Sequence, residues 1–130
     1  MEVVGAVPDI RPYLAHAAAV LAPLRASIGV PNKILEALAM ARPVIATPEA
    51  VRAFPFEPDR DLLIASGADE FATAVRAALA RGPRITAMAL QARRRVVADY
   101  DWETVERQMQ RLVEEAASVR VREPARRGAR

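Results

Sequence analysis

Four short apolar runs mark the first half of the chain, at residues 3–7, 19–24, 43–47 and 62–65. Apolar residues are continuous within each run instead of alternating with polar ones. This pattern is typical of strands that are buried on both faces of a parallel sheet. Proline or glycine lies at or just after the end of each run, so each is predicted to be one short strand.

The stretches between these runs carry apolar residues at helical spacing. We expect a short helix capped by Asp9 and a second helix over residues 31–41. Residues 48–60 contain prolines and acids, which predict a loop. A helix that starts near Asp69 should bury one apolar face. That face carries Phe71, Val75, Ala78 and Leu79.

Two more helices are predicted after the break at Gly82 and Pro83. The first has an apolar stripe at Ile85, Met88, Ala92 and Val96, and the second at Trp102, Val105, Met109, Leu112 and Val113. Strands that alternate with helices favour an α/β fold. We therefore predict a partial Rossmann-like parallel sheet of about four strands with flanking helices, followed by C-terminal helices.

Composition limits the classes of protein that fit. The chain has 130 residues, 52% of them apolar, which suits one folded domain at residues 1–118. Five arginines and one glutamate lie in residues 119–130, whereas the net charge of the whole chain is +3, so the rest is close to neutral. We interpret residues 119–130 as a basic, disordered tail and exclude a nucleic-acid partner, because the body has no basic face with interleaved aromatic residues.

Three features that the sequence lacks bear on the cellular location of the protein. It has no cysteine, no signal-peptide pattern and no apolar run of the roughly 18 residues that a membrane span needs. A cytoplasmic location is therefore predicted. The arginine tail is a weaker candidate for contact with the inner face of the membrane.

The strongest candidate for chemistry lies between residues 29 and 36. Gly29 allows close approach of the backbone to a ligand, and the N–H groups of Asn32 and Lys33 should point out of a helix start, where an anion is favoured. Lys33 adds a positive charge, and Glu36 lies on the same helix face, where a carboxylate can accept ribose hydroxyls. The alternative is an ordinary helix start with a Lys33–Glu36 surface pair.

Other polar residues are weaker candidates. His16 is interpreted as a surface histidine, and Arg94 as the centre of an exposed arginine turn at residues 93–95. Asp59 and Asp61 resemble half of a metal site, but no third ligand is suitably spaced. We expect neither a metal nor another cofactor.

The order of several motifs resembles the C-terminal, donor-binding half of GT-B glycosyltransferases of the retaining family 4, in particular sugar transferases of exopolysaccharide gene clusters. The resemblance covers roughly residues 3–116. It is carried by Gly5, Val7, Pro8, Asp9, Ile10, Arg11, Pro12, Tyr13 and Leu14, then Ala22, Pro23, Leu24, Gly29, Asn32, Lys33, Leu35, Glu36, Ala37 and Ala39, then Arg42, Pro43, Val44, Ile45 and Ala46, with residues 61–65 and 100–102 continuing the match.

This resemblance implies that Glu36 binds the ribose of a nucleotide-sugar donor. Gly29 and the helix start at Asn32 and Lys33 would face the diphosphate and the donor sugar. The backbone of Val7 and Pro8 would lie against the base. The implied reaction transfers a sugar to a polysaccharide or lipid-linked acceptor without a metal. Trp102 would lie on closing helices that brace two domains.

The chain also departs from the family's pattern. Many members have a glutamate eight positions before the equivalent of Glu36, where this chain has Ile28. No acceptor-binding domain is recognisable, so we interpret the chain as a fragment that is inactive in isolation and whose partner is a separate chain with the acceptor domain. The alternative is a non-catalytic nucleotide-sugar-binding or interaction remnant.

Overall fold

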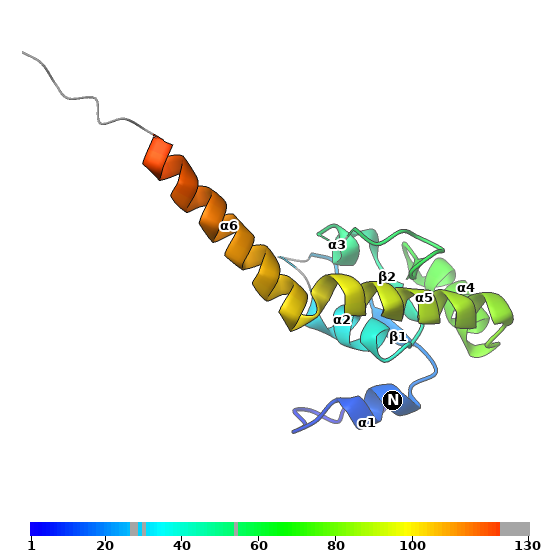
Figure 1. Ribbon diagram of the computed structural model, residues 1–130. Coiled ribbons are helices and arrows are strands. Elements are labelled where there is room, and N and C mark those ends of the chain that lie inside the picture. The colour runs from blue at the N-terminus through cyan, green and yellow to red at the C-terminus, as the bar shows by residue number, and fades with distance from the viewer. Residues whose placement is uncertain (27–28, 30, 54, 123–130) are drawn as a thin grey trace, which may run out of the picture. The chain divides into compact units, whose positions relative to one another are not determined.

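The computed structural model describes residues 1–26, 29, 31–53 and 55–122, without the side chains of residues 119–122 (Figure 1). The chain divides into two compact units, Met1–Val97 and Ala98–Arg130. The first unit contains a parallel sheet with helices, which confirms the predicted α/β class.

The sheet of the first unit has three parallel strands in the order β1–β2–β3. They are β1 (Val20–Ala22), β2 (Val44–Ala46) and β3 (Leu63–Ile64). Val20 pairs with Val44, and Ile45 pairs with Leu63. All three residues of β2 are fully buried, as expected for the central strand of a sheet that is covered on both faces.

The predicted strand at residues 3–7 does not form. Residues 1–6 are exposed and irregular, and in the part of the chain that the structure describes no strand pairs with them. A short apolar segment becomes a strand only when a neighbouring strand accepts its backbone hydrogen bonds. The sheet therefore has three strands where the sequence indicated about four.

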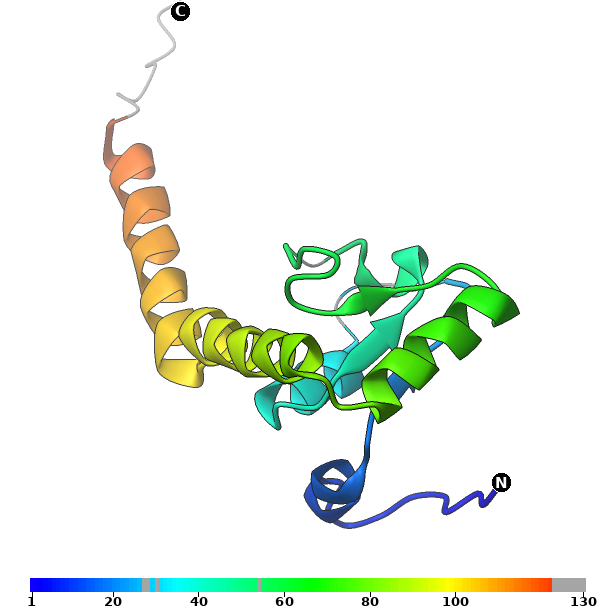
Figure 2. The ribbon, with the colours of Figure 1, turned by 90° about the vertical axis from the view of Figure 1, so that its right-hand side faces the viewer.

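Helices cover both faces of the sheet (Figure 2). Helix α2 (Asn32–Ala39) packs against β1 and β2 through its buried residues, Ile34, Ala37 and Leu38. Helix α4 (Ala68–Leu79) packs against β2, and its Ala78 forms a buried cluster with Ile45 and Ala65. Burial of these apolar side chains is the main force that holds the layers together.

With the exception of one short helix, the remaining helices of the first unit lie close to the positions predicted from the sequence, with small differences in their bounds. Helix α1 (Arg11–His16) begins after Ile10 instead of Asp9, and the predicted loop at residues 48–60 contains the short helix α3 (Pro48–Val51). Helix α5 (Pro83–Tyr100) starts at the predicted break and buries its predicted stripe. Leu79 is exposed, because it lies at the last turn of α4 beyond the sheet-covering face.

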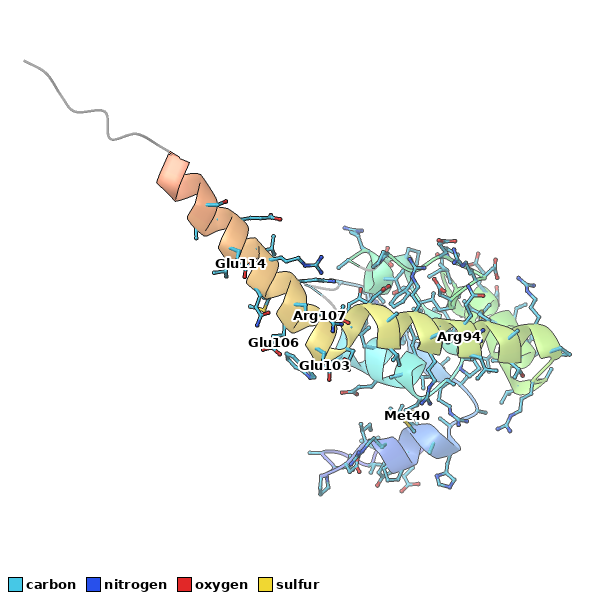
Figure 3. All side chains as sticks on the ribbon, in the orientation of Figure 1. Met40, Arg94, Glu103, Glu106, Arg107 and Glu114 are labelled. Atoms are coloured by element: carbon cyan, nitrogen blue, oxygen red, sulfur yellow. The ribbon has the colours of Figure 1, made fainter. Side chains whose placement is uncertain are left out.

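The second unit consists mainly of α6 (Trp102–Arg122). The helix begins where the sequence predicts it, but it continues to Arg122, so residues 119–122, which were assigned to the disordered tail, are helical. Its expected packing stripe is exposed, however, at Trp102, Met109, Leu112 and Val113. Polar side chains such as Glu106 and Arg107 lie on the same helix (Figure 3). No helix in the described ranges is both long and apolar enough to cross a membrane.

Candidate functional site

The start of α2 is the candidate anion site that the sequence singles out. Gly29 has a φ of +76°, a value that an L side chain rarely adopts. Pro31 is the N-cap residue, so the helix begins one position later than expected, and no side chain caps it. Among the described residues, no hydrogen-bond acceptor is recorded for the N–H groups of Asn32 and Lys33. A helix start of this kind, with its N–H groups and its dipole, favours an anion.

Lys33 and Glu36 both lie on the exposed side of α2. The alternative interpretation, a surface ion pair between them, does not hold, since no salt bridge joins them among the described residues. Three residues of helix separate the two side chains by about 4.5 Å along the axis. The helix thus presents a cation and an acid side by side, each open to a ligand.

Glu36 lines a cavity of about 410 Å³ between α2 and the segment that contains α1. Pro8, named with Glu36 from the sequence, lines the same cavity. Its other lining residues are Asp9, Ile10, Arg11, Leu14, Ala39 and Met40. Val7 is half-buried next to Pro8 but does not line the cavity, and neither do Gly29, Asn32 and Lys33.

The charges of the cavity are partly compensated. Asp9 and Arg11 form an ion pair at 2.9 Å, and Asp9 also accepts a 2.9 Å hydrogen bond from the backbone N–H of Arg11. The side-chain hydrogen bond between them lowers the pKa of Asp9 and raises the pKa of Arg11, and the backbone hydrogen bond lowers the pKa of Asp9 further. Of the two carboxylates that line this cavity, Asp9 is paired with an arginine, whereas Glu36 forms no ion pair among the described residues.

Sequence reasoning missed a buried ion pair. Arg95, which was expected in an exposed turn, has a side chain only 24% exposed and contacts the fully buried carboxylate of Asp61. Asp61 is therefore a structural anchor, while Asp59 pairs with Arg84 at the surface. The spacing of the two partners, 34 positions, leaves no local signal in the sequence.

The other polar residues considered from the sequence do not contribute to this site. His16 is exposed, and its Nδ1 lies 2.7 Å from the carbonyl oxygen of Pro12, as suits a surface histidine. No group of three or more metal-ligating side chains is found within the described ranges. Ile28 and residues 123–130 lie outside the described residues.

The fold and this site define a class. A parallel sheet with helices on both faces, and a glycine turn that leads into α2, form a partial Rossmann-like half of a GT-B fold. The chain matches the family described as Glycosyl transferases group 1 over residues 1–81, more than half of its length. The chain belongs to this family and carries a glycosyltransferase domain. No curated protein and no solved structure matches it.

Proposed function

We propose that this chain binds the nucleotide-sugar donor of a retaining, family 4-like glycosyltransferase. The observation that carries the proposal is the joint placement of Pro8 and Glu36 in one cavity beside the open start of α2. Membership of the glycosyltransferase family supports a sugar-transfer reaction in general. The acceptor we propose is a polysaccharide or a lipid-linked sugar.

The charge distribution divides the donor between two subsites. The cavity at Glu36 holds two acids and one arginine, so it favours neutral groups that donate hydrogen bonds and disfavours a diphosphate. The start of α2, with Lys33 and N–H groups that have no acceptor among the described residues, favours the diphosphate. The base and ribose would then occupy the cavity, with the base near Pro8.

The spacing along α2 fits this assignment. In a nucleoside diphosphate the ribose is esterified directly to the first phosphate, so the two groups need adjacent subsites. Glu36 follows Lys33 by nearly one helical turn, about 4.5 Å along the axis. Glu36 can therefore accept hydrogen bonds from the ribose hydroxyls while Lys33 and the N–H groups of the helix start contact phosphate.

Catalysis would consist of stabilising the charge of the departing diphosphate, which helix dipoles and a lysine can do without a metal. We propose that this chain supplies the donor half, and that a separate chain supplies the acceptor half. Binding of the donor without sugar transfer, even when the acceptor half is present, would favour the alternative of a non-catalytic binding module.

Calorimetric titration with UDP and GDP tests the donor site. We expect one nucleotide to bind, and Glu36→Gln to weaken its binding about tenfold through loss of charge-assisted hydrogen bonds to ribose. Glu103→Gln, an exposed acid on α6, is the matched control and should bind as the wild type does. Equal affinity in the wild type and Glu36→Gln would refute the role of Glu36.

A further inference from the structure

A second cavity, of about 300 Å³, lies at the amino ends of β1 and β2. Ala18 and Pro43 line it just before β1 and β2 begin, whereas Gly29 follows the carboxyl end of β1. This cavity and the proposed diphosphate subsite at the start of α2 therefore lie at opposite ends of the strands. The full lining is Ala18, Ala41, Arg42, Pro43, Arg81, Ile85, Thr86, Ala89 and Leu90.

Arg42 is held in a fixed position at this cavity. Its Nε donates a 3.2 Å hydrogen bond to the carbonyl oxygen of Met40, and its Nη1 donates one of 3.4 Å to that of Ala17. The side chain is half-buried, and no described carboxylate lies within salt-bridge distance of it. A guanidinium that is fixed by neutral carbonyl groups keeps its full positive charge for a ligand.

Arg81 brings a second positive charge from a different part of the chain. It follows the end of α4 with a φ of +48°, and its N–H donates a 3.2 Å hydrogen bond to the carbonyl oxygen of Ala78. Its guanidinium also has no ion-pair partner among the described residues. The turns after α2 and α4 thus bring two uncompensated arginines to one cavity.

The chemistry of the lining distinguishes this cavity from two others in the same unit. None of its nine lining residues is acidic. By contrast, the cavity at Glu36 has two acids and one arginine, and a third cavity has three acids, Asp59, Asp69 and Glu70, with Arg84. An anion is therefore favoured electrostatically in the cavity of Arg42 and Arg81.

The rest of the lining indicates the kind of anion. Pro43, Ile85, Ala89 and Leu90 form an apolar wall, and the hydroxyl of Thr86 adds a polar group. Two guanidinium groups offer several donors to the oxygens of one phosphate, while the wall suits a carbon skeleton attached to it. The geometry points to a phosphate-ester site, distinct from the donor site, that takes either a small organophosphate or a phospholipid headgroup.

Titration of the ¹⁵N-labelled full chain with glycerol 3-phosphate tests this site by amide chemical shifts. We expect saturable shifts at Arg42, Arg81 and Thr86, with a dissociation constant in the millimolar range. Arg81→Gln should weaken binding about fivefold, since it removes one charged partner but no structural contact. Arg93→Gln, an exposed arginine of α5 outside the cavity, should leave binding unchanged.

Shifts that are absent up to about 20 mM ligand, or that are equal in wild type and Arg81→Gln, would overturn the proposal. Saturating UDP should leave these shifts in place, so a failure of the donor site and a failure of this site can be told apart. Co-sedimentation with phosphatidylglycerol vesicles distinguishes a phospholipid headgroup from a small soluble organophosphate as the ligand. Vesicle binding that Arg81→Gln reduces assigns a headgroup, and binding of glycerol 3-phosphate alone assigns a soluble ligand.

Discussion

The carboxylate of Asp61 accepts a 2.5 Å hydrogen bond from Nη1 of Arg95, which lies 34 positions later on α5. The same carboxylate oxygen, Oδ2 of Asp61, also accepts a 2.9 Å hydrogen bond from the backbone N–H of Glu57. Arg95 also stacks over Phe56, with 5.6 Å from Cζ to the ring centroid. This pair ties the segment before β3 to α5, although Arg95 was expected in an exposed turn.

Arg95→Met should lower the free energy of unfolding by about 3 kcal/mol, because it leaves the buried carboxylate of Asp61 without its charged partner. Denaturant unfolding of the full chain measures this change. Arg94→Met, at the neighbouring exposed position in Figure 3, is the control and should change stability by less than about 0.5 kcal/mol. Equal effects of the two substitutions would contradict the structural role of the pair.

Ala41→Gly should stabilise the protein by about 0.5–1 kcal/mol. Ala41 has a φ of +51° at the end of α2, where the N–H groups of Ala41 and Arg42 donate to the carbonyl oxygens of Leu38 and Ala37. These two bonds form a Schellman motif, in which glycine is favoured. Ala87→Gly, on the exposed side of α5, should instead destabilise by about 1 kcal/mol. Thermal unfolding distinguishes the two signs, and a loss of stability in Ala41→Gly would count against the described turn.

Gly29→Ala should lower both stability and nucleotide affinity. A Cβ at Gly29 meets no atom within 4 Å, so the cost arises from the φ of +76° and amounts to about 1 kcal/mol. The backbone that leads into α2 would then shift, which displaces the proposed diphosphate subsite. Gly67→Ala is the matched control, since Gly67 has a φ of +95° away from α2. It should destabilise the fold without changing the affinity for UDP, as unfolding and titration on the same samples can show.

The pKa of Asp9 should rise toward its ordinary value in Arg11→Gln, because the side-chain hydrogen bond from Arg11 is the main cause of its depression. A depressed pKa in the folded state means that the carboxylate favours folding above its unfolded pKa. That contribution disappears as the pH falls through the folded pKa. Titration of the side-chain ¹³C carboxyl shift measures the change directly. An unaltered pKa in the variant would show that the pair is not formed in solution.

The elements most accurately predicted from the sequence are those determined by local patterns. Continuous apolar runs located β1 and β2, and the break at Gly82 and Pro83 located the start of α5. The exposure of Glu36 follows from helical periodicity, since Ile34 and Leu38 occupy the buried face.

Long-range relationships could not be predicted in the same way. The apolar run at residues 3–7 has the same pattern as the runs that form strands. Whether it forms a strand depends on a neighbouring strand that can pair with it, and the run itself does not specify that neighbour. The burial of Arg95 likewise depends on where Asp61 comes to lie after folding. The cavity that joins Pro8 to Glu36 follows from the packing of two segments, and only the family resemblance had linked those residues.

The most direct test of the proposed donor site is a UDP titration, repeated with GDP, followed by amide chemical shifts of the full chain. We predict that the largest saturable shifts fall at Gly29, Asn32, Lys33 and Glu36 and in the residues next to Pro8, and that Glu36→Gln weakens binding about tenfold. Saturable shifts located elsewhere, or no saturable shifts with either nucleotide, would contradict donor binding at the start of α2.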